Sequence, residues 1–136
     1  MSYNESKTVL RVEIPELRGK SNKEAYEYFL PILGEPDDID EWEGEVEYFS
    51  YYEKNHKFVP VSENSYSRNA ANDKWGVDLI LAYGNDYNET IGEANHSLGE
   101  LQNLAQEMAE KFNIDPSRCK VVSYTWYNGG DEPIDF

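Results

Sequence analysis

The sequence lacks the residues that would form disulfide bonds or hold a small protein in a membrane. Its 136 residues include one cysteine, Cys119, so an internal disulfide is excluded and a reducing compartment is favoured. No segment approaches the run of about 20 apolar residues that crosses a membrane. The first residues also lack the apolar stretch of a signal peptide. We therefore expect a cytoplasmic protein that does not contact membranes.

Motifs for catalysis are missing as well. The chain has two histidines, His56 and His96, and it contains no glycine-rich phosphate loop, no CxxC pair and no HExxH motif. The segment that begins at Asp86 resembles the start of an EF-hand loop, but Ser97 stands where a bidentate glutamate is needed. The sequence therefore predicts no enzymatic activity, no catalytic residue, no cofactor and no metal site.

Positive charge is scarce. Twelve Lys and Arg residues stand against 27 Asp and Glu residues, which gives a formal net charge of −15. Such a balance repels nucleic acid and attracts basic partners over long distances. Solubility alone is an alternative explanation. We therefore expect that the protein does not bind nucleic acid directly. Its expected partner is a basic protein, most simply a nucleic-acid-binding enzyme.

Aromatic residues are abundant. Eleven Tyr, five Phe and three Trp make up 14% of the chain, too many for a disordered acidic protein. The length fits one domain, so we expect a single acidic α+β domain over residues 1–136. Loose tails are predicted at 1–6 and 129–136, and a long exposed loop is predicted at 62–74.

Hydrophobic periodicity and capping signals predict the elements. Residues 7–15 and 75–83 alternate between apolar and polar side chains, as half-buried strands do. Ser21 and Ser97, each followed three residues later by Glu, are predicted to begin two amphipathic helices. Residues 34–40 are expected to form a loop, and further strands are predicted at about 43–52, 57–61 and 119–127.

This order, β-α-β-β-β-α-β, is typical of an α+β fold. It predicts a mostly antiparallel sheet of about five strands, with both helices packed on one face. A sheet edge that stays unpaired would also permit a homodimer.

An acidic segment is the candidate binding site. Residues 35–47 hold eight carboxylates and no base. If Glu43, Glu45 and Glu47 share a strand face, they stand about 6.8 Å apart. That spacing is near every second phosphate of a nucleic-acid strand, which advances about 3.4 Å per phosphate. The row is a physical basis for nucleic-acid mimicry, although a solvated outer sheet face gives the same alternation.

Aromatic residues follow the acids directly. Phe49 and Tyr51 share strand parity with the glutamates, so they are expected on the exposed face, with Tyr48 and Tyr52 inward. Aromatic rings surrounded by charge are typical of interfaces. The alternative is that the helices cover Phe49 and Tyr51. The residues predicted to bind a partner are Asp37, Asp38, Asp40, Glu41, Glu43, Glu45, Glu47, Phe49 and Tyr51.

Two classes of function lead, ahead of an enzyme of an unrecognised kind and a structural or housekeeping interaction domain. The charge pattern favours an acidic inhibitor that blocks the basic nucleic-acid-binding surface of a nuclease or defence effector. Such an anti-defence, DNA-mimic or immunity-type protein would act in the cytoplasm, that of the host if it is phage-encoded. The alternative is a protein that binds a small molecule or sequesters a nucleotide in an aromatic pocket. Its stacking platform would be Trp75, Trp126 or Tyr66.

Overall fold

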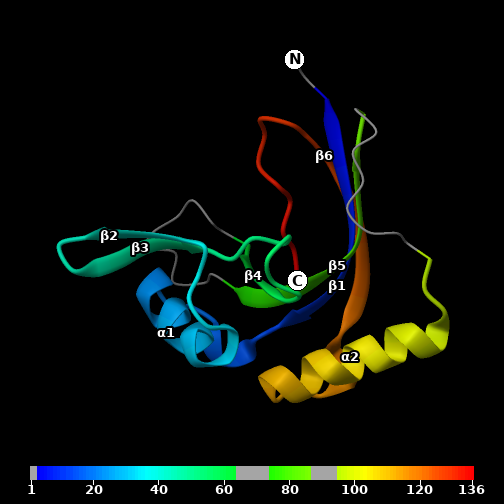
Figure 1. Ribbon diagram of the computed structural model, residues 1–136, viewed down its shortest axis with the longest axis horizontal. Coiled ribbons are helices and arrows are strands. Elements are labelled where there is room, and N and C mark those ends of the chain that lie inside the picture. Colours follow the sequence, from blue (N-terminus) through cyan, green and yellow to red (C-terminus); the bar gives the residue numbers. More distant parts are fainter. Residues whose placement is uncertain (1–2, 64–73, 87–94) are drawn as a thin grey trace.

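The computed structural model describes residues 3–63, 74–86 and 95–136. Its mixed architecture of antiparallel strands and two α-helices confirms the predicted α+β class and the predicted order (Figure 1). The structure has one strand more between the helices than predicted, and its strands form a sheet of four and a separate sheet of two. The described elements are β1 (Asn4–Glu13), α1 (Asn22–Leu33), β2 (Asp38–Trp42), β3 (Glu45–Ser50), β4 (Val59–Ser62), β5 (Trp75–Asn85), α2 (Leu98–Phe112) and β6 (Lys120–Tyr127). Short 3₁₀ turns lie at Pro15–Leu17 and Pro116–Arg118.

The main sheet has four antiparallel strands in the order β4-β5-β1-β6. β1 lies in the middle and pairs with β5 and β6, with Leu10 opposite Leu79 and Arg11 opposite Asp78. Alternation sends Leu10 and Val12 into the hydrophobic core, whereas Arg11 lies on the other face of the sheet. Both faces of β1 are therefore buried at its centre.

Both helices begin where the capping signals predict. In α1 the Ser21 hydroxyl accepts a hydrogen bond from Glu24 N, and in α2 Ser97 accepts from Glu100 N. The helices meet in the core, where the rings of Phe29 and Phe112 pack edge to face with centroids 6.3 Å apart. In Figure 1 they lie near one another beneath the hairpin and the sheet.

The expectation of loose tails at 1–6 and 129–136 is wrong for residues 4–6 and for the C-terminal segment, and residues 1–2 lie outside the described residues. Residues 4–6 belong to β1 and pair with both neighbouring strands. At the other end, Asp135 O accepts a hydrogen bond from Arg11 Nη1 at 3.1 Å. The Phe136 ring covers Gly76 so closely that a Cβ built there would lie 2.1 Å from the ring. Of the loop expected at 62–74, Ser62 ends β4, and 64–73 lie outside the described residues.

The acidic segment forms a hairpin of its own. β2 pairs with β3 in a separate two-stranded sheet, which extends away from the main sheet in Figure 1. Glu43 and Gly44 connect the strands with φ values of +52° and +80°. A two-residue turn of this kind favours Asn-Gly or Asp-Gly, so Glu-Gly is a weak turn signal. The loop expected at 34–40 is wrong beyond Asp37, where β2 begins. The weak turn signal is the reason that the sequence did not predict this strand.

Candidate functional site

The base of the hairpin is held by Asp37. Its carboxylate accepts hydrogen bonds from Tyr52 N at 2.7 Å and from Asn55 Nδ2 at 2.9 Å, and His56 Nε2 lies 3.1 Å away. The backbone hydrogen bond from Tyr52, with those of Asn55 and His56, lowers the pKa of Asp37. Asp37 was predicted to contact a partner. Its carboxylate oxygens instead accept hydrogen bonds from residues of the same chain, so we assign Asp37 the role of positioning the base of the hairpin.

One face of the hairpin is buried against α1 and the main sheet. The ring of Phe49 stacks on Trp75, with centroids 5.6 Å apart and planes within 9°. Tyr51 donates from its hydroxyl to Gly34 O at 2.7 Å, and burial raises the pKa of that hydroxyl to about 12. Both aromatic residues belong to the core cluster. The prediction that Phe49 and Tyr51 are exposed partner contacts is therefore wrong.

The parity argument fails because β3 contains an irregularity. Tyr48 lies opposite Asp40, whereas Val46 lies opposite the next residue, Glu41, so Glu47 is the extra residue of β3 in this register. Such a bulge reverses the face on which the preceding residues lie. Glu45 and Phe49 are four residues apart but point to opposite faces. Parity along the sequence alone could not show this.

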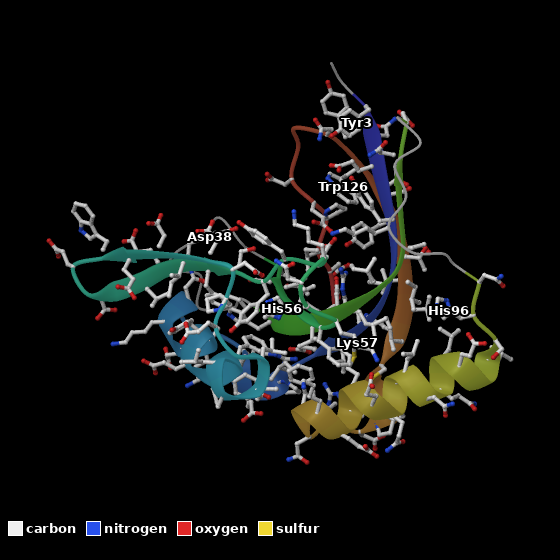
Figure 2. All side chains as sticks on the ribbon, viewed as in Figure 1. Tyr3, Asp38, His56, Lys57, His96 and Trp126 are labelled. Atoms are coloured by element: carbon white, nitrogen blue, oxygen red, sulfur yellow. The ribbon has the colours of Figure 1, made fainter. Side chains whose placement is uncertain are left out.

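The outer face of the hairpin combines rings with carboxylates. It carries Asp38, Asp40 and Trp42 from β2, and Glu45 and Tyr48 from β3, because cross-strand partners and alternate residues share a face. Trp42 is 66% exposed and Tyr48 is 48% exposed. Figure 2 shows Asp38 on the side of the hairpin that faces away from α1. We call these five residues the outer hairpin face.

The two exposed aromatic residues were missed by the sequence reasoning. Trp42 interrupts the acidic segment between Glu41 and Glu43, and a large apolar residue amid charges was an available signal. Tyr48 was assigned to the core by the same parity argument that misplaced Phe49. A partner that covers these rings removes apolar surface from water, which stabilises the complex.

The carboxylates on the hairpin differ in their surroundings. Asp38, Asp40, Glu41 and Glu43 are exposed. Glu45 lies at the edge of the outer hairpin face, where it reaches Lys23 of α1 in a solvent-exposed ion pair at 3.6 Å. A contact of this type is worth about 0–1 kcal/mol. The expected row of Glu43, Glu45 and Glu47 on one face is not present, since the first lies in the turn and the last in the bulge.

A small pocket adjoins the hairpin. It has a volume of about 250 Å³, and β3, β4, Trp75 and the C-terminal segment line it, including Tyr48, Tyr51 and Glu132. Of the predicted stacking platforms, Trp75 lines this pocket but already stacks on Phe49. Trp126 packs against another aromatic side chain of β6, and Tyr66 lies outside the described residues.

The described residues contain neither a grouped set of metal ligands nor a membrane-spanning helix. Within 3–63, 74–86 and 95–136, no three His, Cys, Asp or Glu side chains are grouped as metal ligands. In the same ranges no helix is both long and apolar enough to cross a membrane. His56 lies at the hairpin base and His96 beside the start of α2, well separated in Figure 2.

Searches for relatives complete the description. Comparison with protein-family models, with curated proteins and with solved structures finds no match.

Proposed function

We propose that the protein is an inhibitor that binds another protein through its acidic hairpin. The partner is a basic, nucleic-acid-binding enzyme, such as a nuclease or another defence effector, and the inhibitor covers the surface that would bind nucleic acid. The observation that carries the proposal is the outer hairpin face, in which Trp42 and Tyr48 are exposed among Asp38, Asp40 and Glu45.

Charge and aromatic rings supply different parts of such an interaction. A net charge of −15 accelerates encounter with a basic surface and makes association sensitive to salt. Exposed ion pairs add little affinity, about 0–1 kcal/mol each. Desolvated Trp and Tyr side chains dominate many interfaces and often cost 2 kcal/mol or more when truncated. Trp42 and Tyr48 therefore provide the affinity, while the carboxylates provide speed and selectivity.

The mimicry of nucleic acid is retained in altered form. Asp38 and Asp40 are alternate residues of β2, so their positions on the outer hairpin face lie about 6.8 Å apart along the strand. Phosphates advance by about 3.4 Å along a nucleic-acid strand. A surface that holds every second phosphate can accept this pair. The protein would act in the cytoplasm, that of the host if a phage encodes it.

The test begins with the identification of a partner. Affinity capture from the native host in low and high salt, followed by mass spectrometry, yields candidates that bind electrostatically. The purified partner is then titrated with labelled nucleic acid and with the inhibitor. We expect competition between the two and loss of the partner's activity on nucleic acid. Simultaneous binding of both, with activity unchanged, contradicts the proposal.

A matched pair of charge reversals locates the contact. The hairpin variant combines Asp38→Lys with Asp40→Lys on the outer hairpin face. The helix variant combines Glu27→Lys in α1 with Glu110→Lys in α2, and it changes the net charge by the same amount. All four carboxylates are on exposed residues. The hairpin variant should lose most of its affinity and the helix variant little. Equal losses would show that net charge, rather than the hairpin, governs binding.

A second candidate is the binding of a small molecule in the pocket beside Trp75. Its volume of about 250 Å³ lies below the usual ligand-pocket range of about 300–1,000 Å³. Glu132 in the lining disfavours anionic ligands such as nucleotides. Native mass spectrometry of the freshly purified protein separates the candidates, because a retained small molecule supports the pocket and a retained basic protein supports the hairpin.

A further inference from the structure

The outermost strand β6 is a second surface available for assembly. In the part of the chain that the structure describes, β6 pairs with β1 alone and forms one edge of the main sheet. It is eight residues long, and its sequence, KVVSYTWY, is rich in residues that favour strands. A long regular edge of this type is a template for another strand unless the protein protects it.

The opposite edge of the sheet is protected in a way that β6 is not. β4 has four residues and includes Pro60, which offers no N–H for pairing. In β6 the single charged residue is Lys120, at the first position of the strand. The two edges therefore differ in length and in their capacity to form hydrogen bonds.

Hydrogen-bonding geometry determines which groups of β6 point outward. Asn128 N donates to Tyr3 O at 2.8 Å, next to the partner pair Asn4 and Tyr127. In an antiparallel ladder, pairs that exchange hydrogen bonds alternate with pairs that do not. Asn128 and Tyr3 form a pair that is hydrogen-bonded, so every second residue before Asn128 is hydrogen-bonded to β1 as well. These are the even-numbered residues of β6. The N–H and C=O groups of Val121, Ser123 and Thr125 point away from the sheet.

We propose that β6 pairs antiparallel with β6 of a second copy of this chain, about a twofold axis at Tyr124. This register places Val121 opposite Tyr127 of the second copy and Ser123 opposite Thr125 of the second copy. It joins the outward-pointing groups of Ser123 and Thr125 in the two copies, and it joins two four-stranded sheets into one continuous sheet. At each end of the ladder Tyr127 O already accepts a hydrogen bond from Gly130 N at 2.9 Å, so Tyr127 pairs with Val121 through its N–H.

The side chains of β6 match this register. Val121 is 52% exposed and Tyr127 is 57% exposed, and both lie on the same face of the sheet. The twofold axis forms this pair twice, once at each end of the joined strands, so that each Val121 is covered by a Tyr127 of the other copy. An axis at Ser123 would instead place Val121 against Thr125. Apolar cross-strand pairs stabilise a sheet more than such a mixed pair.

Charge explains why a copy of the chain can approach here. Two molecules of net charge −15 repel each other, but β6 contains no carboxylate. Pairing through β2 or β3 would instead bring acidic side chains together, because β2 carries three carboxylates and β3 carries two. Salt should strengthen the β6 dimer by screening the net repulsion, whereas it should weaken binding of a basic partner by the hairpin.

The experiment is sedimentation equilibrium from about 1 µM to about 1 mM, with circular dichroism to verify folding. We expect a dimer in the wild type. Val121→Lys should weaken it about tenfold or more, and adding Tyr127→Glu should restore it, because each new lysine then faces a glutamate of the other copy. Leu98→Lys, at an exposed position of α2, is the matched control and should leave the dimer unchanged.

Amide hydrogen exchange tests the same contact without a substitution. Protection of the Ser123 and Thr125 amides should increase with protein concentration, whereas Val122 and Tyr124, which bond to β1, should not change. A monomer at every concentration, or a dimer that Val121→Lys leaves intact, overturns the proposal. Failure of Tyr127→Glu to restore the dimer overturns the register centred on Tyr124.

Discussion

Arg11 and Asp78 form a buried ion pair between β1 and β5. Arg11 Nε donates to Asp78 Oδ1 at 2.7 Å, and Nη2 donates to Oδ2 at 2.8 Å, with side chains that are 0% and 2% exposed. The guanidinium also lies over the rings of Tyr124 and Phe136, at 5.2 and 5.7 Å from their centroids. Burial raises the pKa of Asp78, and the hydrogen bonds and charge of Arg11 oppose that shift.

This pair gives the first prediction. Arg11→Met should lower the free energy of unfolding by about 3–5 kcal/mol, because it leaves the Asp78 carboxyl buried without its counter-charge. Urea denaturation measures the loss. Adding Asp78→Leu should recover much of it, since replacing both partners by apolar side chains removes the uncompensated charge. A loss below about 1 kcal/mol for Arg11→Met would show that the pair is not buried as described.

The second prediction separates the buried from the exposed aromatic residues of the hairpin. Phe49→Ala should cost about 3–5 kcal/mol of unfolding free energy, because it removes a ring stacked on Trp75 in the core. Trp42→Ala and Tyr48→Ala should change stability by about 0.5 kcal/mol or less. Thermal and urea denaturation of the three variants make the comparison.

The same variants should rank in the opposite order for binding. Trp42→Ala and Tyr48→Ala should each raise the rate of dissociation from the partner, corresponding to about 2 kcal/mol or more. Surface plasmon resonance measures this rate once a partner is purified. If both variants dissociate like the wild type, the affinity does not reside in the exposed rings of the outer hairpin face.

The third prediction concerns pH. Because hydrogen bonds lower the pKa of Asp37 in the folded state, its contribution to stability is fully present above its ordinary value of 3.8. That contribution is lost as the pH falls through the lowered value. The stability difference between the wild type and Asp37→Asn should therefore shrink on acidification.

Urea denaturation in steps from about pH 6 to about pH 2 measures this difference. Asp38→Asn is the matched control, because it removes one negative charge from the adjacent position at an exposed side chain. A difference for Asp37→Asn that stays constant over this range would contradict the positioning role of its carboxylate.

The fourth prediction concerns the buried hydroxyl of Tyr51. Its pKa is raised to about 12 by burial, with carboxylates nearby, and it donates to Gly34 O. Ultraviolet difference titration of the wild type against Tyr51→Phe should show one tyrosine that ionises near that pH. The variant should also lose about 1 kcal/mol of stability with its hydrogen bond. A difference signal centred near pH 10 would place Tyr51 in water.

Local signals in the sequence were sufficient for several elements. The two N-cap signals depend on residues three apart, so Ser21 and Ser97 could be recognised as helix starts without knowledge of the fold. The full capping box forms in α1, whereas α2 has the hydrogen bond from Glu100 N to Ser97. Alternation along β1 and β5 likewise marked both as strands. It indicated one buried face, whereas the structure buries both faces along part of each strand. The acidic segment 35–47 and its eight carboxylates follow from the sequence alone.

The tertiary structure decided which side chains of that segment are exposed. The bulge at Glu47 exists only because β3 pairs with β2, and it transfers Phe49 to the core and leaves Tyr48 in solvent. No periodicity within β3 encodes that pairing. The role of Asp37 is equally nonlocal, since its hydrogen-bond donors come from the segment after β3.

The docking of the C-terminal segment was also beyond sequence reasoning. Arg11 bonds to Asp135 O across 124 positions and to Asp78 across 67. Composition and local pattern thus determined the fold class, the helix starts and the acidic character of this protein. Its exposed aromatic residues, its buried ion pair and its ordered tail depend on contacts between residues distant in sequence, which form only when the chain has closed on itself.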